Sequence, residues 1–249
     1  MNAHIVTPQH RRIAYHFTPG SGSTVVFLGG FKSDMSGTKA MFLEKWARAA
    51  GRAFLRFDYS GHGADSAAFE EGCIGDWFED ACAALGLIDG PVVLVGSSMG
   101  GWISLLISRA MPHKVAGFVG IAAAPDFTED GFWAGFSDAQ KDELERAGKV
   151  ALPSEYGDPY IITKRLIEEG RTRLVLRASL DLPFPVRLLQ GTGDTSVATD
   201  VPLRLMDHAT CPDLQLTLLK GADHSFSSGT CLPLIVTAIE DVTIAAAGG

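Results

Sequence analysis

Residues 93–102 read VLVGSSMGGW and place a serine in a glycine frame. The frame Gly-x-Ser-x-Gly, from Gly96 to Gly100, is centred on Ser98, whereas no such frame surrounds Ser97. A serine hydroxyl is a weak nucleophile that needs a base, a site for developing negative charge and an exposed, constrained position. A sharp strand-to-helix turn flanked by glycines supplies that position. We therefore predict that Ser98 is the nucleophile of an acyl-transfer reaction.

An acidic residue and a histidine follow Ser98 in the order that this arrangement requires. Asp194 lies in QGTGDTSV, directly after an apolar run, and His224 lies in KGADHSFS, after another. Catalytic residues of open α/β sheets gather in loops at the carboxyl ends of the strands. The predicted site is a triad in which His224 takes the Ser98 proton at Nε2 and Asp194 holds the Nδ1–H.

The negative charge that develops on a substrate carbonyl oxygen needs two N–H donors. In a strand–elbow–helix site, one donor follows the nucleophile and the other lies in the loop after the third strand. These positions are Met99 and, after VVFLGG, Phe31, which we expect to form the oxyanion hole. Gly29 and Gly30 allow the main chain to approach closely there, although a tight turn at the end of a strand also explains them.

Two further titratable residues lie near a strand end, in the stretch FDYSGHGADS. Asp58 precedes the nucleophile in the chain, where this arrangement does not place its acid. His62 fits a turn built on Gly61 and Gly63. Both are weaker candidates than Asp194 and His224.

Short apolar runs alternate with longer segments of helical periodicity, which is typical of a mainly parallel twisted sheet with helices on both faces. The runs predicted as strands cover residues 12–17, 24–28, 53–57, 91–95, 115–121, 186–189 and 214–219. The segments predicted as helices cover residues 38–50, 75–87, 99–110, 201–209 and 231–245. This order places Ser98 between a strand and a helix, and Asp194 and His224 after the last two strands.

Residues 125–182 interrupt this alternation, because a simple crossover between neighbouring parallel strands needs far fewer residues. We expect residues 1–249 to form a single α/β domain in which residues 125–182 are an inserted, short helical lid. Phe127, Phe132 and Trp133 lie near the start of this segment. These aromatic side chains either pack within the lid or bind the acyl part of a substrate, and both interpretations stay open.

Composition narrows the class of partner. The chain has 249 residues, of which 46 % are apolar, a size that suits one large α/β domain. A total of 21 Lys and Arg against 29 Asp and Glu gives a formal charge of −8, which excludes the basic surface typical of proteins that bind nucleic acid. The N-terminus lacks an apolar leader and no long apolar run follows, so we expect a cytoplasmic protein without an integral membrane segment.

The cysteines do not form a recognisable site. They lack Cys-x-x-Cys spacing, which argues against a disulfide framework and against zinc. The predicted acyl transfer needs neither a metal nor an organic cofactor. The four cysteines are Cys73, Cys82, Cys211 and Cys231.

These motifs together resemble the α/β-hydrolase superfamily, and the resemblance extends over most of the chain. Within it, the chain is similar to the family of the mitochondrial palmitoyl-protein thioesterase and acyl-glucuronide esterase and its bacterial relatives. The stretches that carry this similarity are GFKSDMSGTKA, LRFDYSGHG, LVGSSMGGWISLL, LPSEYGDPYIITKRLIEEGR, PVRLLQGTGDTSV and DHSFS. One departure is that Gly29 and Gly30 replace the frequent His-Gly pair before the oxyanion donor, which affects that donor's assignment and not the triad.

The resemblance implies the triad Ser98, Asp194 and His224 and a substrate with an acyl group joined to oxygen or sulfur. Long-chain acyl thioesters are included, either as small molecules or on an acylated protein. Two other functions stay open. A carbon–carbon bond hydrolase or lyase would use the same fold with a different lid. A non-catalytic ligand-binding protein would be marked by a lost triad member, and none is lost here.

Overall fold

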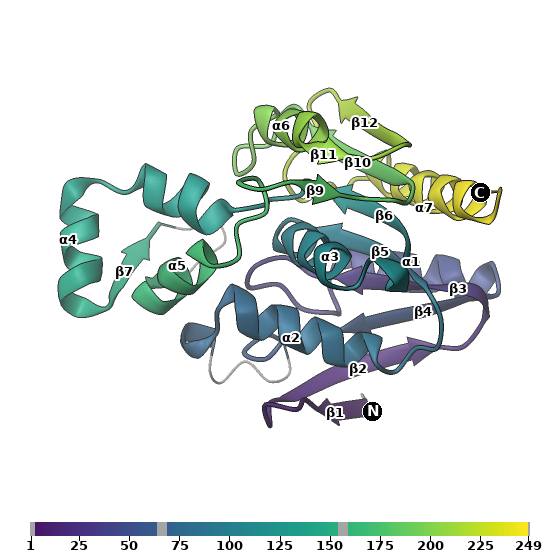
Figure 1. Ribbon diagram of the computed structural model, residues 1–249, viewed down its shortest axis with the longest axis horizontal. Coiled ribbons are helices and arrows are strands. Elements are labelled where there is room, and N and C mark those ends of the chain that lie inside the picture. Colours follow the sequence, from purple (N-terminus) through teal and green to yellow (C-terminus); the bar gives the residue numbers. More distant parts are fainter. Residues whose placement is uncertain (1–2, 64–68, 154–158, 249) are drawn as a thin grey trace.

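The seven runs predicted as strands form one eight-stranded sheet together with a strand at residues 3–6 that was not predicted (Figure 1). The computed structural model describes residues 3–63, 69–153 and 159–248. The strand order is β1-β2-β4-β3-β5-β6-β10-β12. The β1–β2 and β2–β4 pairs are antiparallel, and every pair from β4 to β12 is parallel. The strands are β1 (Ala3–Val6), β2 (Arg12–Thr18), β3 (Ser21–Leu28), β4 (Arg52–Phe57), β5 (Val92–Ser97), β6 (Val115–Ile121), β10 (Val186–Gly191) and β12 (Leu214–Leu219).

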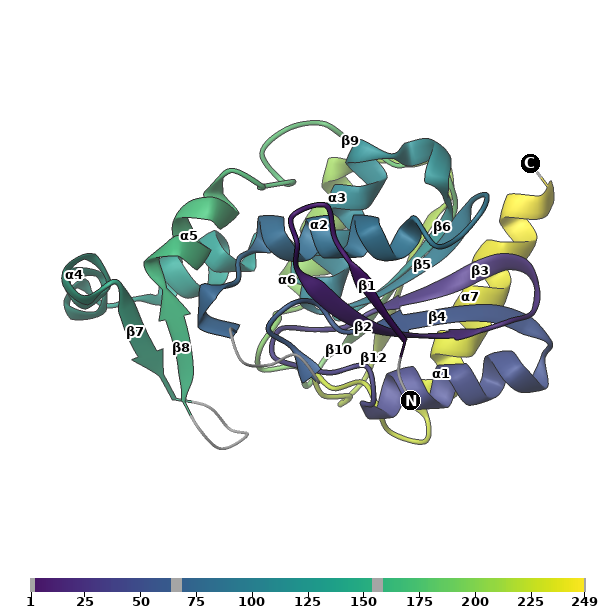
Figure 2. The same cartoon turned by 90° about the horizontal axis from the view of Figure 1, so that it is seen from below.

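Helices cover both faces of this sheet (Figure 2). On one face lie α1 (Thr38–Ala49) and α7 (Cys231–Gly248), and on the other lie α2 (Ile74–Leu85), α3 (Met99–Ala110) and α6 (Asp200–His208). The central strands are therefore buried on both sides, which explains why they read as continuous apolar runs rather than as alternating patterns. The predicted fold class is confirmed.

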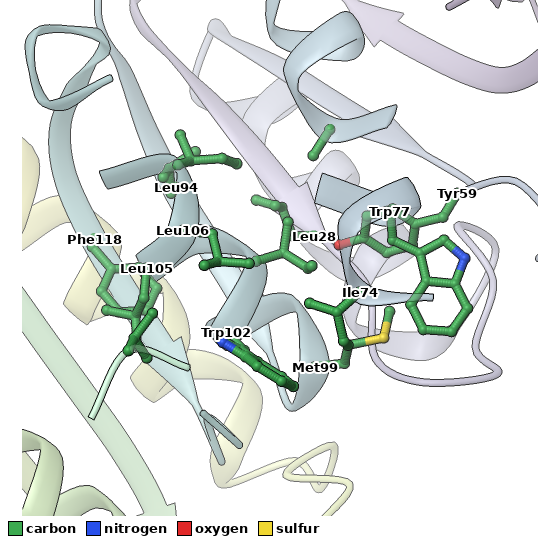
Figure 3. Close-up of a cluster of buried hydrophobic side chains, with 14 of the residues drawn as sticks. Leu28, Tyr59, Ile74, Trp77, Leu94, Met99, Trp102, Leu105, Leu106 and Phe118 are labelled. Atoms are coloured by element: carbon green, nitrogen blue, oxygen red, sulfur yellow. The ribbon is translucent and has the colours of Figure 1, made fainter. Parts of the chain in front are cut away.

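The helix that begins at the predicted nucleophile is anchored in the larger apolar cluster (Figure 3). Met99 and Trp102 of α3 are fully buried beside Leu28 of β3 and Ile74 and Trp77 of α2. Protein cores are close-packed and resist displacement. The sequence therefore fixes the start of α3 against the end of β3, which is the geometry that a strand-to-helix nucleophile requires.

The segment 125–182, called the insert below, leaves the sheet after β6 and returns before β10, and its middle part projects to one side of the molecule (Figure 1, Figure 2). It contains the expected helices and also an antiparallel strand pair, β7 with β8. Residues 154–158 of the quoted stretch LPSEYGDPYIITKRLIEEGR, and residues 64–66 of FDYSGHGADS, lie outside the described residues. The elements of the insert are a π-helical turn (Thr128–Trp133), α4 (Asp138–Ala147), β7 (Lys149–Leu152), β8 (Tyr160–Thr163), α5 (Lys164–Arg171) and β9 (Leu180–Asp181), which pairs with β11 (Ala209–Thr210).

One buried carboxylate ties the two ends of the insert together. Asp126, at the start, has a left-handed backbone with φ of 60° and accepts the Val175 and Leu176 N–H groups at 2.8 and 3.0 Å. It also pairs with Arg177 at 3.2 Å. Burial raises the pKa of Asp126, against the opposing effect of these partners. The start of the insert is therefore tied to residues 175–177, which precede β9 and the return to the sheet.

Helix α7 meets the criteria of length and hydropathy for a membrane span, alone among the helices of the described residues. Its five buried residues lie against the sheet, and the core helix of a globular protein has the same composition. Those residues are Cys231, Ile235, Ala238, Ile239 and Val242.

Candidate active site

Ser98 lies on the turn between β5 and α3 in a backbone conformation that L-residues rarely adopt, with φ of 54° and ψ of −116°. Such a residue costs about 1–3 kcal/mol and persists only where its surroundings hold it. Here the Ser98 N–H donates to the Ile121 carbonyl at 2.9 Å, and the Ser98 carbonyl accepts the N–H groups of Gly101 and Ala124 at 2.9 and 3.1 Å. Backbone hydrogen bonds thus hold the strained turn from the neighbouring strand.

The glycines around Ser98 allow three backbone segments to meet. A Cβ on Gly96 would lie 2.4 Å from the carbonyl oxygen of Gly100, and one on Gly100 would lie 2.1 Å from that of Leu28. Real Cβ atoms do not approach backbone atoms this closely. The glycine frame in the sequence therefore has a steric cause in the fold.

Gly100→Ala is expected to destabilise the protein and to slow its reaction. The new methyl group must push α3 away from the end of β3, and overpacking of this kind costs about 1–3 kcal/mol. For a chain of this size, that lowers Tm by about 2–12 °C. Because Met99 moves with α3, kcat/KM should fall by at least about tenfold.

The matched control is Gly135→Ala in the insert, where a Cβ would meet no atom within 4 Å. Thermal melts and kcat/KM on one ester compare the two variants with the wild type. Equal Tm and equal kcat/KM in all three proteins would contradict the steric explanation.

His224 lies between the other two predicted triad residues. Its Nε2 is 3.0 Å from Ser98 Oγ, and its Nδ1 is 2.8 Å from Asp194 Oδ2. Ser98 comes from the β5–α3 turn, Asp194 from the loop after β10 and His224 from the loop after β12. Both distances are those of hydrogen bonds, so the fold brings together the three residues that the sequence singles out.

The Asp194 carboxylate is fully buried and takes part in four hydrogen bonds. Its Oδ1 accepts the N–H groups of Ser196 and Val197 at 2.8 Å, and its Oδ2 faces His224 and accepts from Gln190 Nε2 at 3.0 Å. Burial opposes ionisation, but the hydrogen bonds from His224 and from the backbone outweigh it and lower the pKa of Asp194. An ionised acid therefore faces the Nδ1 atom of the histidine.

The two predicted oxyanion donors belong to backbone beside Ser98. Met99 is the first residue of α3, and N–H groups in the first turn of a helix have no acceptor within that helix. Phe31 lies in the loop after β3, where a Cβ on Gly30 would come within 3.3 Å of Ser98 Cβ. Both segments therefore lie beside Ser98, and their role as oxyanion donors stays a prediction.

The weaker candidates Asp58 and His62 have hydrogen-bond partners outside the triad. Asp58 Oδ1 accepts the Met35 N–H at 2.6 Å, and His62 Nε2 accepts the Lys32 N–H at 3.2 Å. Both acceptors therefore bind the loop that follows β3. This use of the two side chains is one that sequence reasoning missed.

A cavity of about 740 Å³ adjoins Ser98 and His224. Small-molecule sites commonly measure about 300–1,000 Å³. Among the described residues, Phe27 and four further Phe or Tyr side chains line this cavity. Three of these four come from the insert, and the Phe31 ring lies 5.7–5.9 Å from them. This aromatic wall consists of Phe31, Phe127, Phe132 and Tyr160.

The third aromatic residue of the predicted substrate site lies elsewhere. Trp133 is not among the described residues that line the cavity. The centre of its ring lies 4.4 Å from the guanidinium carbon of Arg171 and 5.3 Å from the Lys141 Nζ, and both of these residues belong to the insert. Phe127 and Phe132 remain candidates for acyl binding, whereas the prediction for Trp133 is corrected to a packing role within the insert.

Polar side chains line the rest of the cavity, among them Lys39 in the first turn of α1. Lys39 Nζ donates to the Ser225 carbonyl, next to His224, and burial lowers its pKa to about 8 against the nearby charges of Asp223 and Cys231. The sequence offered no local sign of this burial. Within the described part of the chain, no group of three or more His, Cys, Asp or Glu residues stands in position to hold a metal ion.

Comparison with known proteins gives a family match and close relatives. The model of the alpha/beta hydrolase family matches residues 20–229. The mitochondrial palmitoyl-protein thioesterase ABHD10 of Rattus norvegicus is 34 % identical over 238 residues, which cover 94 % of this chain and 80 % of the relative. Sequence and site geometry therefore point to the same group of proteins.

Solved structures agree with this match. A putative hydrolase from Agrobacterium vitis superposes with a TM-score of 0.93 at 36 % identity, covering 98 % of both chains. The alpha/beta hydrolase domain-containing protein 10 from mouse superposes with a TM-score of 0.88 at 31 % identity, covering 97 % of both chains. The likeness covers the insert as well as the sheet.

The prediction of a cytoplasmic protein is wrong. The rat relative and its counterparts in cattle, mouse and human are named as mitochondrial proteins. The error has a physical reason, because a compartment is addressed by a segment that a receptor reads and that need not belong to the folded catalytic domain. Composition and charge of the domain therefore carry no information on its compartment.

Proposed function

This chain belongs to the alpha/beta hydrolase family, and we propose that it hydrolyses carboxylic thioesters and esters through an acyl-Ser98 intermediate. The observation that carries the proposal is the hydrogen-bonded series from Ser98 Oγ to His224 Nε2, at 3.0 Å, and from His224 Nδ1 to Asp194 Oδ2, at 2.8 Å. A nucleophile, a base and a group that orients the base are the parts that acyl transfer needs.

The first half-reaction forms the acyl-enzyme. Ser98 Oγ bonds to the substrate carbonyl carbon while His224 Nε2 takes the hydroxyl proton. The carbonyl oxygen becomes an oxyanion that the N–H groups of Phe31 and Met99 stabilise. The bond from carbon to the leaving sulfur or oxygen then breaks, and His224 returns the proton to the departing thiol or alcohol.

The second half-reaction releases the acid. A water molecule gives a proton to His224 and bonds to the acyl carbon through a second oxyanion. The bond to Ser98 Oγ then breaks, Ser98 recovers its proton from His224, and a carboxylic acid leaves. Asp194 keeps the imidazole oriented and stabilises its charged form in both halves.

The acyl part of the substrate binds along the aromatic wall of the cavity. Phe127, Phe132 and Tyr160 come from the insert, so the insert acts as the lid of the acyl pocket. Apolar rings favour an aliphatic chain. Together with relatives named palmitoyl-protein thioesterase, this wall supports long-chain acyl thioesters as the substrate class, either as small molecules or on the cysteine of an acylated protein.

The test is a chain-length profile of kcat/KM on acyl thioesters and on p-nitrophenyl esters, from two to sixteen acyl carbons, with a β-diketone assayed in parallel. We expect kcat/KM to rise with chain length, because each buried methylene contributes about 0.8 kcal/mol, which is roughly a fourfold gain. A maximum at two to four carbons would contradict the long-chain substrate. Cleavage of the β-diketone alone would favour the carbon–carbon hydrolase instead.

Two neighbouring aromatic residues supply a matched pair of variants. Phe132→Ala removes part of the aromatic wall and should flatten the rise with chain length. Trp133→Ala removes a ring that lies outside the cavity and should keep the wild-type profile. The proposal for the acyl pocket fails if both variants give the same profile.

A further inference from the structure

His62 is a buried histidine that the proposed reaction does not use. Only 2 % of its surface is exposed, and its ring packs edge-on against Tyr59, Phe69 and Trp77 at centroid distances of 5.5, 5.0 and 5.0 Å. Such packing confines the plane of the imidazole ring. A polar ring held this way in an apolar surrounding needs hydrogen bonds to offset its desolvation.

One ring nitrogen of His62 faces a hydrogen-bond acceptor and the other faces a donor. Nδ1 lies 3.2 Å from the Ser60 carbonyl oxygen, which can only accept, and Nε2 lies 3.2 Å from the Lys32 N–H, which can only donate. The neutral imidazole with its proton on Nδ1 satisfies both bonds at once. Burial lowers the pKa of His62 to about 4, so this neutral form is present near pH 7.

The Ser60 end of this chain of bonds is fixed. Ser60 donates through its N–H and hydroxyl to Asp80 Oδ2 at 2.9 and 2.6 Å, and Trp77 Nε1 donates to the Ser60 carbonyl at 3.0 Å. Asp80 is fully buried in α2 and also accepts from Arg11. His62 therefore connects a rigid point on α2 to the loop after β3.

At the other end of this series of hydrogen bonds, Lys32 has an unfavourable backbone conformation. Lys32 has a left-handed backbone with φ of 60°, which a lysine adopts only when neighbouring groups hold it. The Lys32 N–H belongs to the peptide that joins Phe31 to Lys32. A hydrogen bond to this N–H therefore restricts the backbone angle ψ of Phe31 as well. The other side of Phe31 is held within the loop, where the Ser33 N–H and hydroxyl donate to the Gly30 carbonyl at 3.2 and 2.9 Å. Further along, Asp58 and Arg56 bind the backbone of Met35.

We propose that His62 is a positioning residue of the oxyanion hole, which holds the Phe31–Lys32 peptide so that the Phe31 N–H faces the oxygen bound at Ser98. This inference rests on the proposed acyl transfer. His62 touches no reacting atom and acts only through the loop. Its loss should weaken binding of the transition state more than binding of the substrate.

A pair of amide variants separates the two hydrogen bonds of the ring. In His62→Gln the side-chain oxygen can take the place of Nε2 and accept from Lys32. In His62→Asn the shorter amide can take the place of Nδ1 and donate to Ser60, but it does not reach Lys32. We expect His62→Asn to lose about 10- to 100-fold in kcat, with little change in KM, and His62→Gln to recover most of this loss.

The decisive measurement compares two inhibitors across the wild type and both variants. A trifluoromethyl ketone forms a tetrahedral adduct with Ser98 that carries an oxyanion, so its Ki should rise in proportion to the loss of kcat/KM. An ether analogue, with a methylene in place of the carbonyl, makes no such oxyanion, and its Ki should stay constant.

Three outcomes overturn the inference for His62. These are wild-type kcat in His62→Asn, equal losses in the two amide variants, and a parallel rise in Ki for the ketone and the ether. None of these outcomes contradicts the proposed function. That proposal is tested separately, on the wild type alone, by thioester turnover and by fluorophosphonate labelling of Ser98.

Discussion

Ser98→Ala is expected to lower kcat by about 10⁴-fold or more, because removal of a nucleophile leaves only the binding site and the oxyanion donors to act. The Ser98 hydroxyl is the atom that lies 3.0 Å from His224 Nε2. The same variant should show no covalent adduct with a fluorophosphonate, which reacts with activated serines. Steady-state kinetics on a thioester and mass spectrometry of the adduct give the two readouts.

Ser97→Ala is the matched control, one residue away on the same turn. Ser97 is the last residue of β5 and is 5 % exposed, and no glycine frame surrounds it. The control should keep the Ser98 adduct and most of the turnover. An adduct mapped to Ser97, or turnover that survives in Ser98→Ala, would refute Ser98 as the nucleophile.

Asp194→Asn is expected to lower kcat by about 10⁴-fold while the fold stays intact, as in other triads. The N–H groups of Ser196 and Val197 both point at Oδ1, so the amide oxygen of asparagine should take that position. Its NH₂ group would then replace Oδ2 and face His224 Nδ1. To accept from this NH₂, the imidazole must move its proton to Nε2, where it can no longer take the Ser98 proton.

The control for Asp194→Asn is Asp142→Asn, which removes an exposed carboxylate from α4 far from the cavity. It should retain wild-type kcat, and both variants should melt near the wild-type temperature. Because hydrogen bonds from His224 and from the backbone lower the pKa of Asp194 below its usual value of about 3.9, protonation of this group should cost the wild type no activity near neutral pH. A kcat within tenfold of the wild type in Asp194→Asn would rule out its role.

The strands and the nucleophile turn could be predicted from the sequence, because a short run of neighbouring residues is enough to indicate each of them. Strands buried on both faces read as apolar runs, and β5 is buried along its whole length. The turn at Ser98 was predictable because its glycine frame is a local pattern, although the carbonyl oxygen that Gly100 accommodates belongs to Leu28 of β3. Asp194 and His224 were predictable because parallel strands bring their carboxyl ends to one edge.

Other elements depend on contacts that no local pattern reports. Strand β1 has only four residues, which are mostly exposed, so its sequence AHIV shows no regular alternation that would predict its pairing with β2. Strands β7 and β8 stabilise each other inside the insert. Trp133 directly follows Phe132 on a helical turn, and consecutive residues of a helix point to different sides, so their shared aromatic character did not mean a shared side.

The roles of two polar residues, Lys39 and His62, also depend on contacts with distant parts of the chain and could not be predicted from the local sequence. Lys39 near the start of a helix looks like a solvated charge, yet it is bound to Ser225, which lies 186 residues further along the chain. The turn around His62 was expected, but its bond to Lys32 spans 30 residues and joins separate loops. Burial by distant segments, rather than residue type, gives both side chains their roles.

Because 126 residues separate Ser98 from His224, the ribosome adds the predicted nucleophile well before the predicted base. At about 5–20 residues per second, a growing chain carries the nucleophile for about 6–25 s before the histidine has been made. Throughout that interval the Ser98 hydroxyl is an ordinary alcohol, which the reactive acyl compounds of the cell leave unmodified. At Ser98 the nascent polypeptide therefore lacks its predicted base, and the proposed activation of this serine can begin only when β10 and β12 join the sheet and carry Asp194 and His224 to the turn.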